Sequence, residues 1–246
     1  MKQGMFEIKE NVLIAENTLR MRLRGDAAAV TCPGQFVNIQ VEGMFLRRPL
    51  SVCHASPDEL TVIYRVAGAG TAGLAKMLPG DKLNILTGLG NGFDLSLSGE
   101  RPLLIGGGTG TSPLYQLAEE LINQGKSVKV ILGFAKASEV FYEKEFKMLG
   151  AKVVVTTEDG SYGVCGYVTD AMKNNNDYTY FYTCGPEAML KAVCSNAATS
   201  GQMSFSARMG CGFGACMGCT CKTIAGNKRI CRDGPVMKRE EILWEG

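Results

Sequence analysis

The hydrophobic pattern of the chain changes near residue 101, and this change constrains the fold more than any other feature. From residue 5 to about residue 98, short runs rich in β-forming residues are broken by Gly and Pro, as in PGQFVNIQV and ELTVIYRV. Several short strands at this spacing predict a closed antiparallel barrel. One interruption, GTAGLAKMLPG at 70–80, has helical spacing and predicts a single short helix before the last strand.

Beyond Arg101, apolar strand-like runs alternate with helical segments. This alternation predicts a parallel sheet with helices on both faces. The helices are expected at about 113–124, 138–149, 166–175 and 186–199. The last stretch has no clear period, and a segment that buries little core often needs a metal to fold. We therefore expect a β-barrel domain at 1–99, an α/β domain at 100–200 and a small metal-binding segment at 201–246.

Charge and hydropathy exclude several classes of partner. The chain carries 26 Lys and Arg against 24 Asp and Glu, and the basic residues are scattered, so we expect no nucleic-acid partner. No stretch approaches the roughly 18 consecutive apolar residues that span a bilayer, and MKQGMFEIKE lacks the apolar core of a signal peptide. We expect a cytoplasmic protein without membrane contact.

Five of the ten cysteines lie in the last 36 residues. Four of them follow the pattern C-x4-C-x2-C-x11-C, which is the plant-type spacing of a [2Fe-2S] cluster: Cys211, Cys216, Cys219 and Cys231. Interleaved glycines suit a loop that folds around sulfide with its N–H groups close to sulfur. A four-thiolate zinc site is the alternative, although zinc ribbons favour two C-x2-C pairs. We expect Cys221 to pack and not to ligate.

A glycine-rich turn follows the first apolar strand of the α/β half, in IGGGTGTSPL at 105–114. Its glycines allow close approach of the backbone to a pyrophosphate, and the following helix start, with Ser112 as cap and Pro113 in the first turn, supplies N–H groups. The candidate binding residues are Gly106, Gly107, Gly108, Thr109 and Gly110. The alternative is a tight strand-to-helix turn that binds nothing.

The barrel half carries a second set of candidates. In LRRPLSV, Arg48 is suited to pair with a phosphate and Ser51 to bond a flavin edge or a diphosphate. Downstream, we expect Tyr64 and Arg65 to point outward, and a helix start at Gly70 and Thr71 offers another anion site. Two phosphate-compatible helix starts in successive domains predict two dinucleotides.

The sequence TCGP places Cys184, Gly185 and Pro186 at the carboxyl end of a strand, where ligands bind in open α/β sheets. A packed thiol is the alternative for Cys184. The polar loop TEDGSYG at 157–163 either contacts the nicotinamide nucleotide or is a plain turn. His54, the single histidine, has no carboxylate or nucleophile adjacent to it in the sequence, so we expect a structural role.

The order RRPLS, IGGGTGTSPL and TCGP resembles the ferredoxin-NADP reductase superfamily. With RMGCGFGACMGCTC and CRDGPVM added, the whole chain resembles one family within it, the electron-transfer subunits of class B dihydroorotate dehydrogenase. The likeness implies that four cysteines (Cys211, Cys216, Cys219 and Cys231) hold the cluster. It also implies FAD contacts from Arg48, Pro49, Leu50, Ser51, Tyr64, Arg65, Val66, Gly70 and Thr71.

The resemblance further implies an NAD-dependent oxidoreductase subunit of pyrimidine (UMP) biosynthesis. An FMN-containing catalytic subunit would oxidise dihydroorotate, and electrons would cross the cluster and FAD to NAD+, in a heterotetramer of two subunits of each kind. This chain then needs no catalytic acid or base of its own. Two alternatives stay open. One is a FAD and [2Fe-2S] subunit of an NAD(P)H-ferredoxin, sulfide dehydrogenase or hydrogenase complex, and the other is a zinc-stabilised nucleotide-binding regulator without a redox step.

Overall fold

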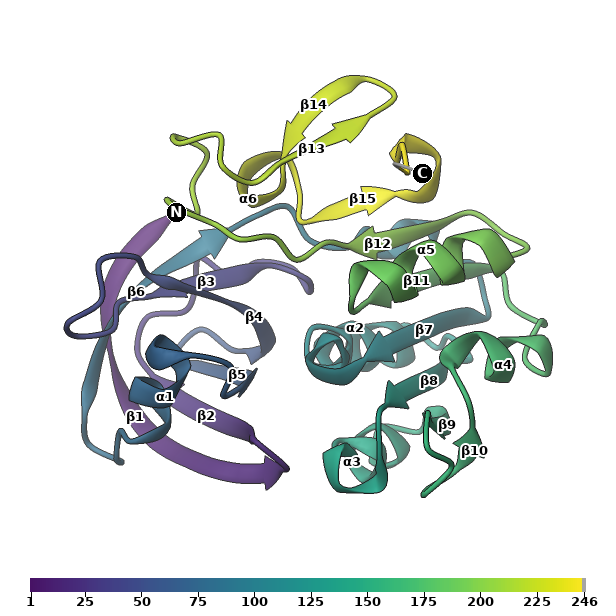
Figure 1. Ribbon diagram of the computed structural model, residues 1–246, viewed down its shortest axis with the longest axis horizontal. Coiled ribbons are helices and arrows are strands. Elements are labelled where there is room, and N and C mark those ends of the chain that lie inside the picture. The colour runs from purple at the N-terminus through teal and green to yellow at the C-terminus, as the bar shows by residue number, and fades with distance from the viewer. Residues whose placement is uncertain (245–246) are drawn as a thin grey trace.

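A computed structural model describes residues 1–244 and shows three parts (Figure 1). The first part is a closed antiparallel barrel, as the sequence predicts, and its strand order is β1-β2-β5-β4-β3-β6. Alternate side chains from these strands fill its interior, including Phe6, Ile8 and Met21. The barrel strands are β1 (Lys2–Ala15), β2 (Thr18–Arg24), β3 (Phe36–Ile39), β4 (Arg48–Ala55), β5 (Glu59–Arg65) and β6 (Lys82–Leu89).

The predicted short helix of the barrel is α1 (Ala69–Ala75), between β5 and β6. A 3₁₀ turn at Leu95–Leu97 leads out of the barrel domain. Leu74 is the fully buried anchor of α1, since its side chain packs into the barrel core. The N-terminal end of α1 therefore lies against the barrel rim, close to the end of β5.

The second part is a seven-stranded sheet in the order β10-β9-β8-β7-β11-β12-β15. Six strands run parallel, and β15 pairs antiparallel with β12 at one edge. The strands are β7 (Pro102–Gly107), β8 (Lys129–Phe134), β9 (Lys152–Thr157), β10 (Val164–Cys165), β11 (Tyr180–Cys184), β12 (Gly201–Ser204) and β15 (Val236–Lys238). The last segment of the chain thus completes the sheet of the domain before it.

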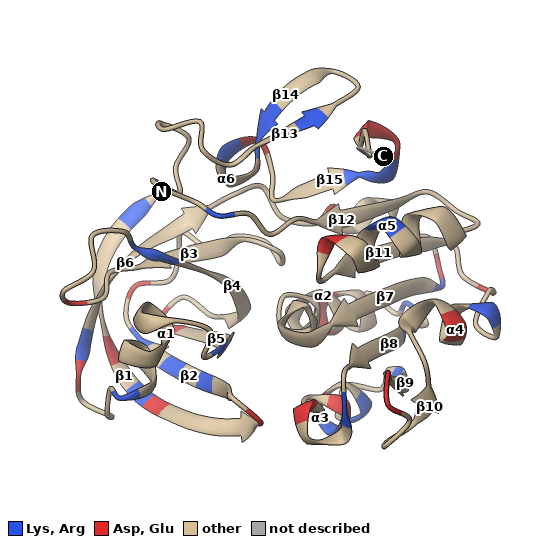
Figure 2. Cartoon of the chain, in the orientation of Figure 1, with Lys and Arg blue, Asp and Glu red and all other residues tan. Residues whose placement is uncertain are grey.

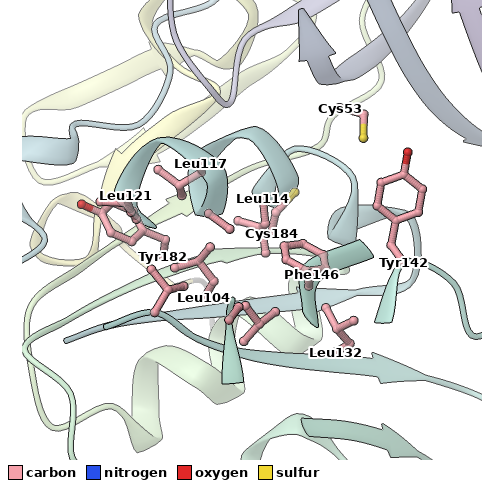
Figure 3. Packing of buried hydrophobic residues seen from close by; sticks show 14 of the residues in the cluster. Cys53, Leu104, Leu114, Leu117, Leu121, Leu132, Tyr142, Phe146, Tyr182 and Cys184 are labelled. Atoms are coloured by element: carbon pink, nitrogen blue, oxygen red, sulfur yellow. The ribbon is translucent and has the colours of Figure 1, made fainter. Parts of the chain in front are cut away.

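Helices cover both faces of this sheet. On one face, α2 and α3 pack in a cluster with Leu104 and Tyr182 (Figure 3). On the other face, α4 and α5 pack against Leu103 and Ile105, because neighbouring residues of β7 point to opposite sides. The helices are α2 (Leu114–Asn123), α3 (Glu143–Met148), α4 (Val168–Lys173) and α5 (Glu187–Asn196), with 3₁₀ turns at Gly108–Thr111 and Ala137–Glu139.

The third part lies across the top of the other two in Figure 1. It holds a hairpin of β13 (Thr220–Thr223) and β14 (Gly226–Arg229), the short helix α6 (Ile230–Asp233), β15 and a 3₁₀ turn at Arg239–Glu241. Its inner side packs on Phe36, Leu86 and Leu89 of the barrel. The cysteine segment is therefore supported by both domains.

The barrel and the α/β domain share a buried boundary. Cys53 at the end of β4 belongs to the same core cluster as Tyr142, whose hydroxyl points toward it (Figure 3). Burial raises the pKa of the Cys53 thiol to about 12, although a hydrogen bond with Tyr142 opposes the shift.

His54 has a carboxylate partner in the structure, although none is adjacent to it in the sequence. Its Nε2 lies 3.1 Å from Oε2 of Glu119 on α2. The fold brings together residues 65 positions apart.

Charges of both signs are spread over all three parts (Figure 2). No helix within residues 1–244 has the length and apolar character needed to cross a membrane.

Candidate functional site

The cysteine loop between β12 and β13 directs backbone N–H groups at sulfur. Ala215 and Cys216 donate to Sγ of Cys211 at 3.2 and 3.5 Å, and Cys211 donates to Sγ of Cys216 at 3.4 Å. Gly212 and Gly214 allow the loop its tight path, with φ of 79° and 92°. Such N–H groups stabilise negative charge on thiolate ligands.

The four predicted ligands form two pairs. Cys211 and Cys216 lie toward solvent, whereas Cys219 and Cys231 are buried and joined by a bond from the Cys231 N–H to Sγ of Cys219 at 3.4 Å. No three Cys, His, Asp or Glu side chains of residues 1–244 converge on a single ion. Two cysteines for each iron is the requirement of a [2Fe-2S] cluster, so the donor set fits that group.

Cys211 and Cys231, one from each pair, have pKa values shifted in opposite directions. Burial opposes ionisation of Cys211, but backbone hydrogen bonds from Phe213, Cys216 and Ala215 outweigh it and lower its pKa to about 6. Burial and the neighbouring Cys219 thiol raise the pKa of Cys231 to about 12. Because ligands bind metal as thiolates, the lowered pKa of Cys211 favours its ligand form, whereas Cys231 would have to lose its proton to hold a cluster.

Polar contacts fasten the cysteine loop to its surroundings. The Asn38 side chain on β3 donates to the Cys211 carbonyl at 3.0 Å, and Arg229 donates to the Gly214 carbonyl at 3.0 Å. The Cys221 thiol lies 3.8 Å from the thioether of Met237, so it packs as expected. The loop is anchored to the barrel at β3, the strand that pairs with β4.

On β4, Arg48, Pro49, Leu50 and Ser51 are all half-buried, whereas the next two residues are buried. The Arg48 side chain crosses the first turn of α1, where a Cβ at Gly70 would collide with its guanidinium. Among the described residues, this guanidinium donates only to the carbonyls of Leu46 and Arg47. A cation without a carboxylate partner beside helical N–H groups fits a diphosphate.

The expected outward orientation of Tyr64 is wrong. Its side chain is 1% exposed inside the barrel, and its hydroxyl donates to Oδ1 of Asn11 at 2.9 Å. Successive residues of a strand point to opposite faces, so Arg65 points outward and Tyr64 cannot. The whole Tyr64 residue is therefore buried, while Val66 is half-buried.

A small cavity of about 60 Å³ separates β4 from the segment that leads into the cysteine loop. Pro49 and Ser51 form one wall, and Phe205 and Met209 form the opposite wall. The candidate flavin strand and the candidate cluster segment thus face each other across one space.

A larger cavity of about 510 Å³ lies at the carboxyl ends of the parallel strands. Gly107 and Gly108 line it from the glycine-rich turn, and Pro186 lines it from TCGP. The hydroxyl of Thr156 is buried there without a hydrogen-bond partner among the described residues, which fits a site that binds a polar ligand. The position agrees with the ligand site of open α/β sheets.

Other predicted residues support this cavity without lining it. Gly110 lies so close to β11 that a Cβ would collide with the Cys184 carbonyl, so glycine is needed there. The Cys184 thiol is 3% exposed and burial raises its pKa to about 12, so the thiol packs in the core. Gly106, Thr109 and Gly185 belong to the same turn and strand ends.

The expected cap at Ser112 is wrong. A helical turn already begins at Gly108, so Ser112 lies within a continuous helical stretch, and Pro113 is the N-cap of α2. The Ser112 hydroxyl is buried without a partner among the described residues. The N–H groups near the cavity therefore belong to the 3₁₀ turn at Gly108–Thr111.

Sequence reasoning missed several lining residues. Glu139 and Tyr167 line the large cavity, and neither stands in a recognisable motif. Glu158, in the loop predicted only as a possible contact, also lines it, directly after β9. In nucleotide-binding α/β units, an acidic residue at the end of a strand often binds the ribose. Glu158 in the sequence TEDG could have been recognised on this ground.

Two family models match the chain. Residues 206–243 match the iron-sulfur cluster binding domain of dihydroorotate dehydrogenase B, and residues 104–195 match the oxidoreductase NAD-binding domain. These matches favour iron-sulfur chemistry over the zinc alternative. The first match begins shortly before the cysteine loop, and the second begins in the strand that precedes the glycine-rich turn.

Curated relatives are similar over nearly the full chain. The "dihydroorotate dehydrogenase B (NAD(+)), electron transfer subunit" of Shouchella clausii is 40% identical, with 98% of both chains covered. The protein of the same name from Fusobacterium nucleatum is 41% identical over 97% of both chains.

Solved structures show the same fold. An NADH-dependent reduced ferredoxin-NADP oxidoreductase has a TM-score of 0.88 and 29% identity, covering 97% of this chain and 90% of that one. A ferredoxin NADP+ reductase from Neisseria gonorrhoeae with bound FAD and NADP has a TM-score of 0.68 and 21% identity, covering 80% and 90%.

Proposed function

The chain belongs to the family of electron-transfer subunits of NAD+-dependent dihydroorotate dehydrogenase B, and we propose that it carries electrons from a catalytic subunit to NAD+. The donor is the FMN of a subunit that oxidises dihydroorotate in UMP synthesis. The route runs through a [2Fe-2S] cluster and FAD held by this chain.

The cofactors supply the electron chemistry, since a flavin exchanges one or two electrons, a cluster carries one and NAD+ accepts two. The protein supplies binding and orientation. The two cysteine pairs hold the cluster, and their loop N–H groups and partial burial set its charge environment. Asn38 fixes this loop on the barrel next to β4.

We assign FAD to the barrel rim and NAD+ to the large cavity. Arg48 and the first turn of α1 would bind the FAD diphosphate, and Ser51 would face the flavin ring across the small cavity. The glycine-rich turn and Pro186 would bind the NAD+ diphosphate and neighbouring groups. The buried Tyr64 would support the FAD site from inside the barrel, and the buried Cys184 would pack beneath the NAD+ site.

One observation carries this proposal: the flavin strand and the cluster segment border the same small cavity. Ser51 lies on one side, and Met209, two residues before the first cysteine, lies on the other. Adjacent redox groups are what a relay requires. A nucleotide-binding protein without electron transfer would need no such proximity.

The deciding assay is NAD+ reduction by dihydroorotate, followed at 340 nm, with this chain co-purified with its catalytic subunit. The chain alone and the catalytic subunit alone are the controls. Activity only in the pair supports the relay, whereas a flavin- and cluster-loaded pair without activity refutes the substrate assignment. A Cys231→Ser variant should lose the cluster spectrum and keep FAD; retention of the full spectrum would refute the ligand assignment.

The family name implies a catalytic partner, and we further propose a cytoplasmic heterotetramer of two catalytic and two electron-transfer subunits. Light scattering on the co-expressed complex should return the mass of two of each. A mass of one of each would refute this stoichiometry without affecting the relay.

A second candidate function rests on the similarity to an NADH-dependent reduced ferredoxin-NADP oxidoreductase, which covers 97% of this chain. In that case the chain would exchange electrons with a different partner through the same cofactors. Dye reduction by NADH without dihydroorotate activity in any complex would favour this candidate.

A further inference from the structure

The side chain of Arg229, at the end of β14, reaches into the cysteine loop. Its Nη1 donates to the Gly214 carbonyl at 3.0 Å, within the segment between Cys211 and Cys216. The side chain is 23% exposed, so this contact is partly shielded from water. Arg229 thus joins the loop that carries the solvent-facing cysteine pair to the start of α6, which carries Cys231.

The bonded carbonyl belongs to the same peptide group as an N–H that points at sulfur. The peptide bond between Gly214 and Ala215 is trans and planar, so its carbonyl and its N–H point in opposite directions. The Ala215 N–H donates to Sγ of Cys211 at 3.2 Å. Fixing the carbonyl therefore fixes the direction of this donor. A hydrogen bond at the carbonyl also polarises the peptide group and strengthens the donor at its other end.

Gly214 is a position where the backbone needs such a restraint. Its φ is 92°, and a Cβ there would lie 2.7 Å from Cδ of Arg232, so the structure has no room for a side chain. Glycine restricts its own backbone less than any other residue does. The bond from Arg229 supplies the restriction that the missing side chain cannot.

Asp233 holds Arg229 in this position. Its Oδ2 accepts from the Arg229 backbone N–H at 2.9 Å and from Nε at 3.2 Å, and its Oδ1 lies 3.5 Å from Nη2. The carboxylate also neutralises the guanidinium, so the pair brings little net charge to the cysteine loop. The effect of Arg229 on sulfur must therefore pass mainly through the Gly214–Ala215 peptide.

We propose that Arg229 is a positioning residue for the cluster: it orients the Gly214–Ala215 peptide so that the N–H stabilises negative charge on Sγ of Cys211. The inference rests on the proposed assignment of a [2Fe-2S] cluster to the four cysteines. Hydrogen bonds to ligand sulfur raise the reduction potential of a cluster, because the reduced form carries more negative charge. Arg229 thereby makes the cluster a better acceptor of electrons from the catalytic subunit.

The test is a redox titration of the FAD- and cluster-loaded protein, with the reduced cluster followed by electron paramagnetic resonance. In Arg229→Ala, the ratio of reduced to oxidised cluster at a fixed potential should fall about three- to tenfold, the range of one hydrogen bond. For a one-electron couple, a tenfold fall is a shift of about 59 mV to lower potential. Arg229→Lys keeps the charge but loses the fork that bonds both partners, so it should show part of the shift.

Lys228→Gln is the matched control for these variants. Lys228 precedes Arg229 on β14 and is similarly buried, but it pairs with Glu241 at 2.9 Å. Its replacement should leave the potential of the cluster unchanged. A potential in Arg229→Ala equal to that in Lys228→Gln would overturn the inference. If Arg229→Ala does not retain a cluster, Arg229→Lys decides by the same comparison.

Asp233→Ala separates positioning from an effect of charge. Removal of the carboxylate leaves the Arg229 charge without its neutralising partner, which would raise the potential if the charge itself acted on the cluster. Loss of the anchor should instead lower the potential, in the same direction as Arg229→Ala. A raised potential in Asp233→Ala would therefore overturn the inference. If the unaltered protein gives no [2Fe-2S] signal, the assignment of the four cysteines fails, and the role of Arg229 fails with it.

Discussion

Asn91 provides the sharpest test of how the cysteine segment is held on the barrel. Its side chain donates to the Val236 carbonyl at 2.7 Å and accepts from the Val236 N–H at 3.0 Å. Its backbone N–H donates to the Gly234 carbonyl at 2.7 Å. These bonds secure the stretch between α6, which carries Cys231, and β15. Substitution by alanine removes both side-chain bonds to Val236 and a local bond from the Gly92 N–H, and it keeps the backbone bond.

The expected cost follows from the two lost bonds to Val236, because the Gly92 N–H lies in an exposed turn and can bond to water instead. Each contributes about 0.5–1.5 kcal/mol, and Val236 is buried at 2% exposure, so Asn91→Ala should cost about 2 kcal/mol. For a chain of this length, that corresponds to a fall in Tm of about 4–8 °C. Hydrogen exchange should increase at residues 230–238 before it increases in the barrel strands.

The assay is thermal unfolding by circular dichroism of the cofactor-loaded protein, with hydrogen exchange read by mass spectrometry. Asn227→Ala is the control, since Asn227 is exposed on the β13–β14 hairpin and makes no side-chain hydrogen bond within the described residues. If the two variants unfold at the same temperature, the bonds of Asn91 do not hold the segment, and the reasoning is refuted.

Three further outcomes follow from the large cavity and the buried thiols. Gly110→Ala should weaken NAD+ binding at least about tenfold in titration calorimetry, because the added Cβ collides with the Cys184 carbonyl and displaces the turn. Glu158→Arg should improve NADPH binding relative to NADH by about tenfold, and equal ratios in Glu158→Arg and the Asp159→Arg control would contradict this. Cys53 ionises near 9.0 when unfolded and near 12 when folded, so stability should fall as pH rises above 9. In urea unfolding, Cys53→Ala should flatten this fall.

Both domains of the fold could be predicted because their signals are local. Alternation of polar and apolar residues specified the barrel strands, and the switch to alternating strands and helices specified the parallel sheet. β12 and β15 escaped prediction, since they have only four and three residues and are stabilised by pairing with each other and with β11. Strands this short have too few residues to show an alternating hydrophobic pattern.

The wrong expectations for site residues arose where the position of a residue within its strand or helix was not taken into account. Tyr64 and Arg65 cannot share a face of one strand, and the barrel core takes the aromatic side chain. Ser112 cannot cap a helix whose first turn begins four residues earlier. His54 finds its carboxylate on a helix of the other domain, which no window along the sequence contains.

The sequence by itself determined the chemistry: the spacing of four cysteines, the glycines between them and the glycine-rich turn after a strand. These are short-range requirements, because a loop of fixed length around a cluster or a phosphate depends on nearby backbone angles. Only the tertiary structure decided which cysteine pair is buried and how Asn38 of the barrel reaches the cysteine loop. Asn38 and Cys211 lie 173 positions apart, and Asn91 and Val236 lie 145 apart, so only the packing of the three parts brings them together.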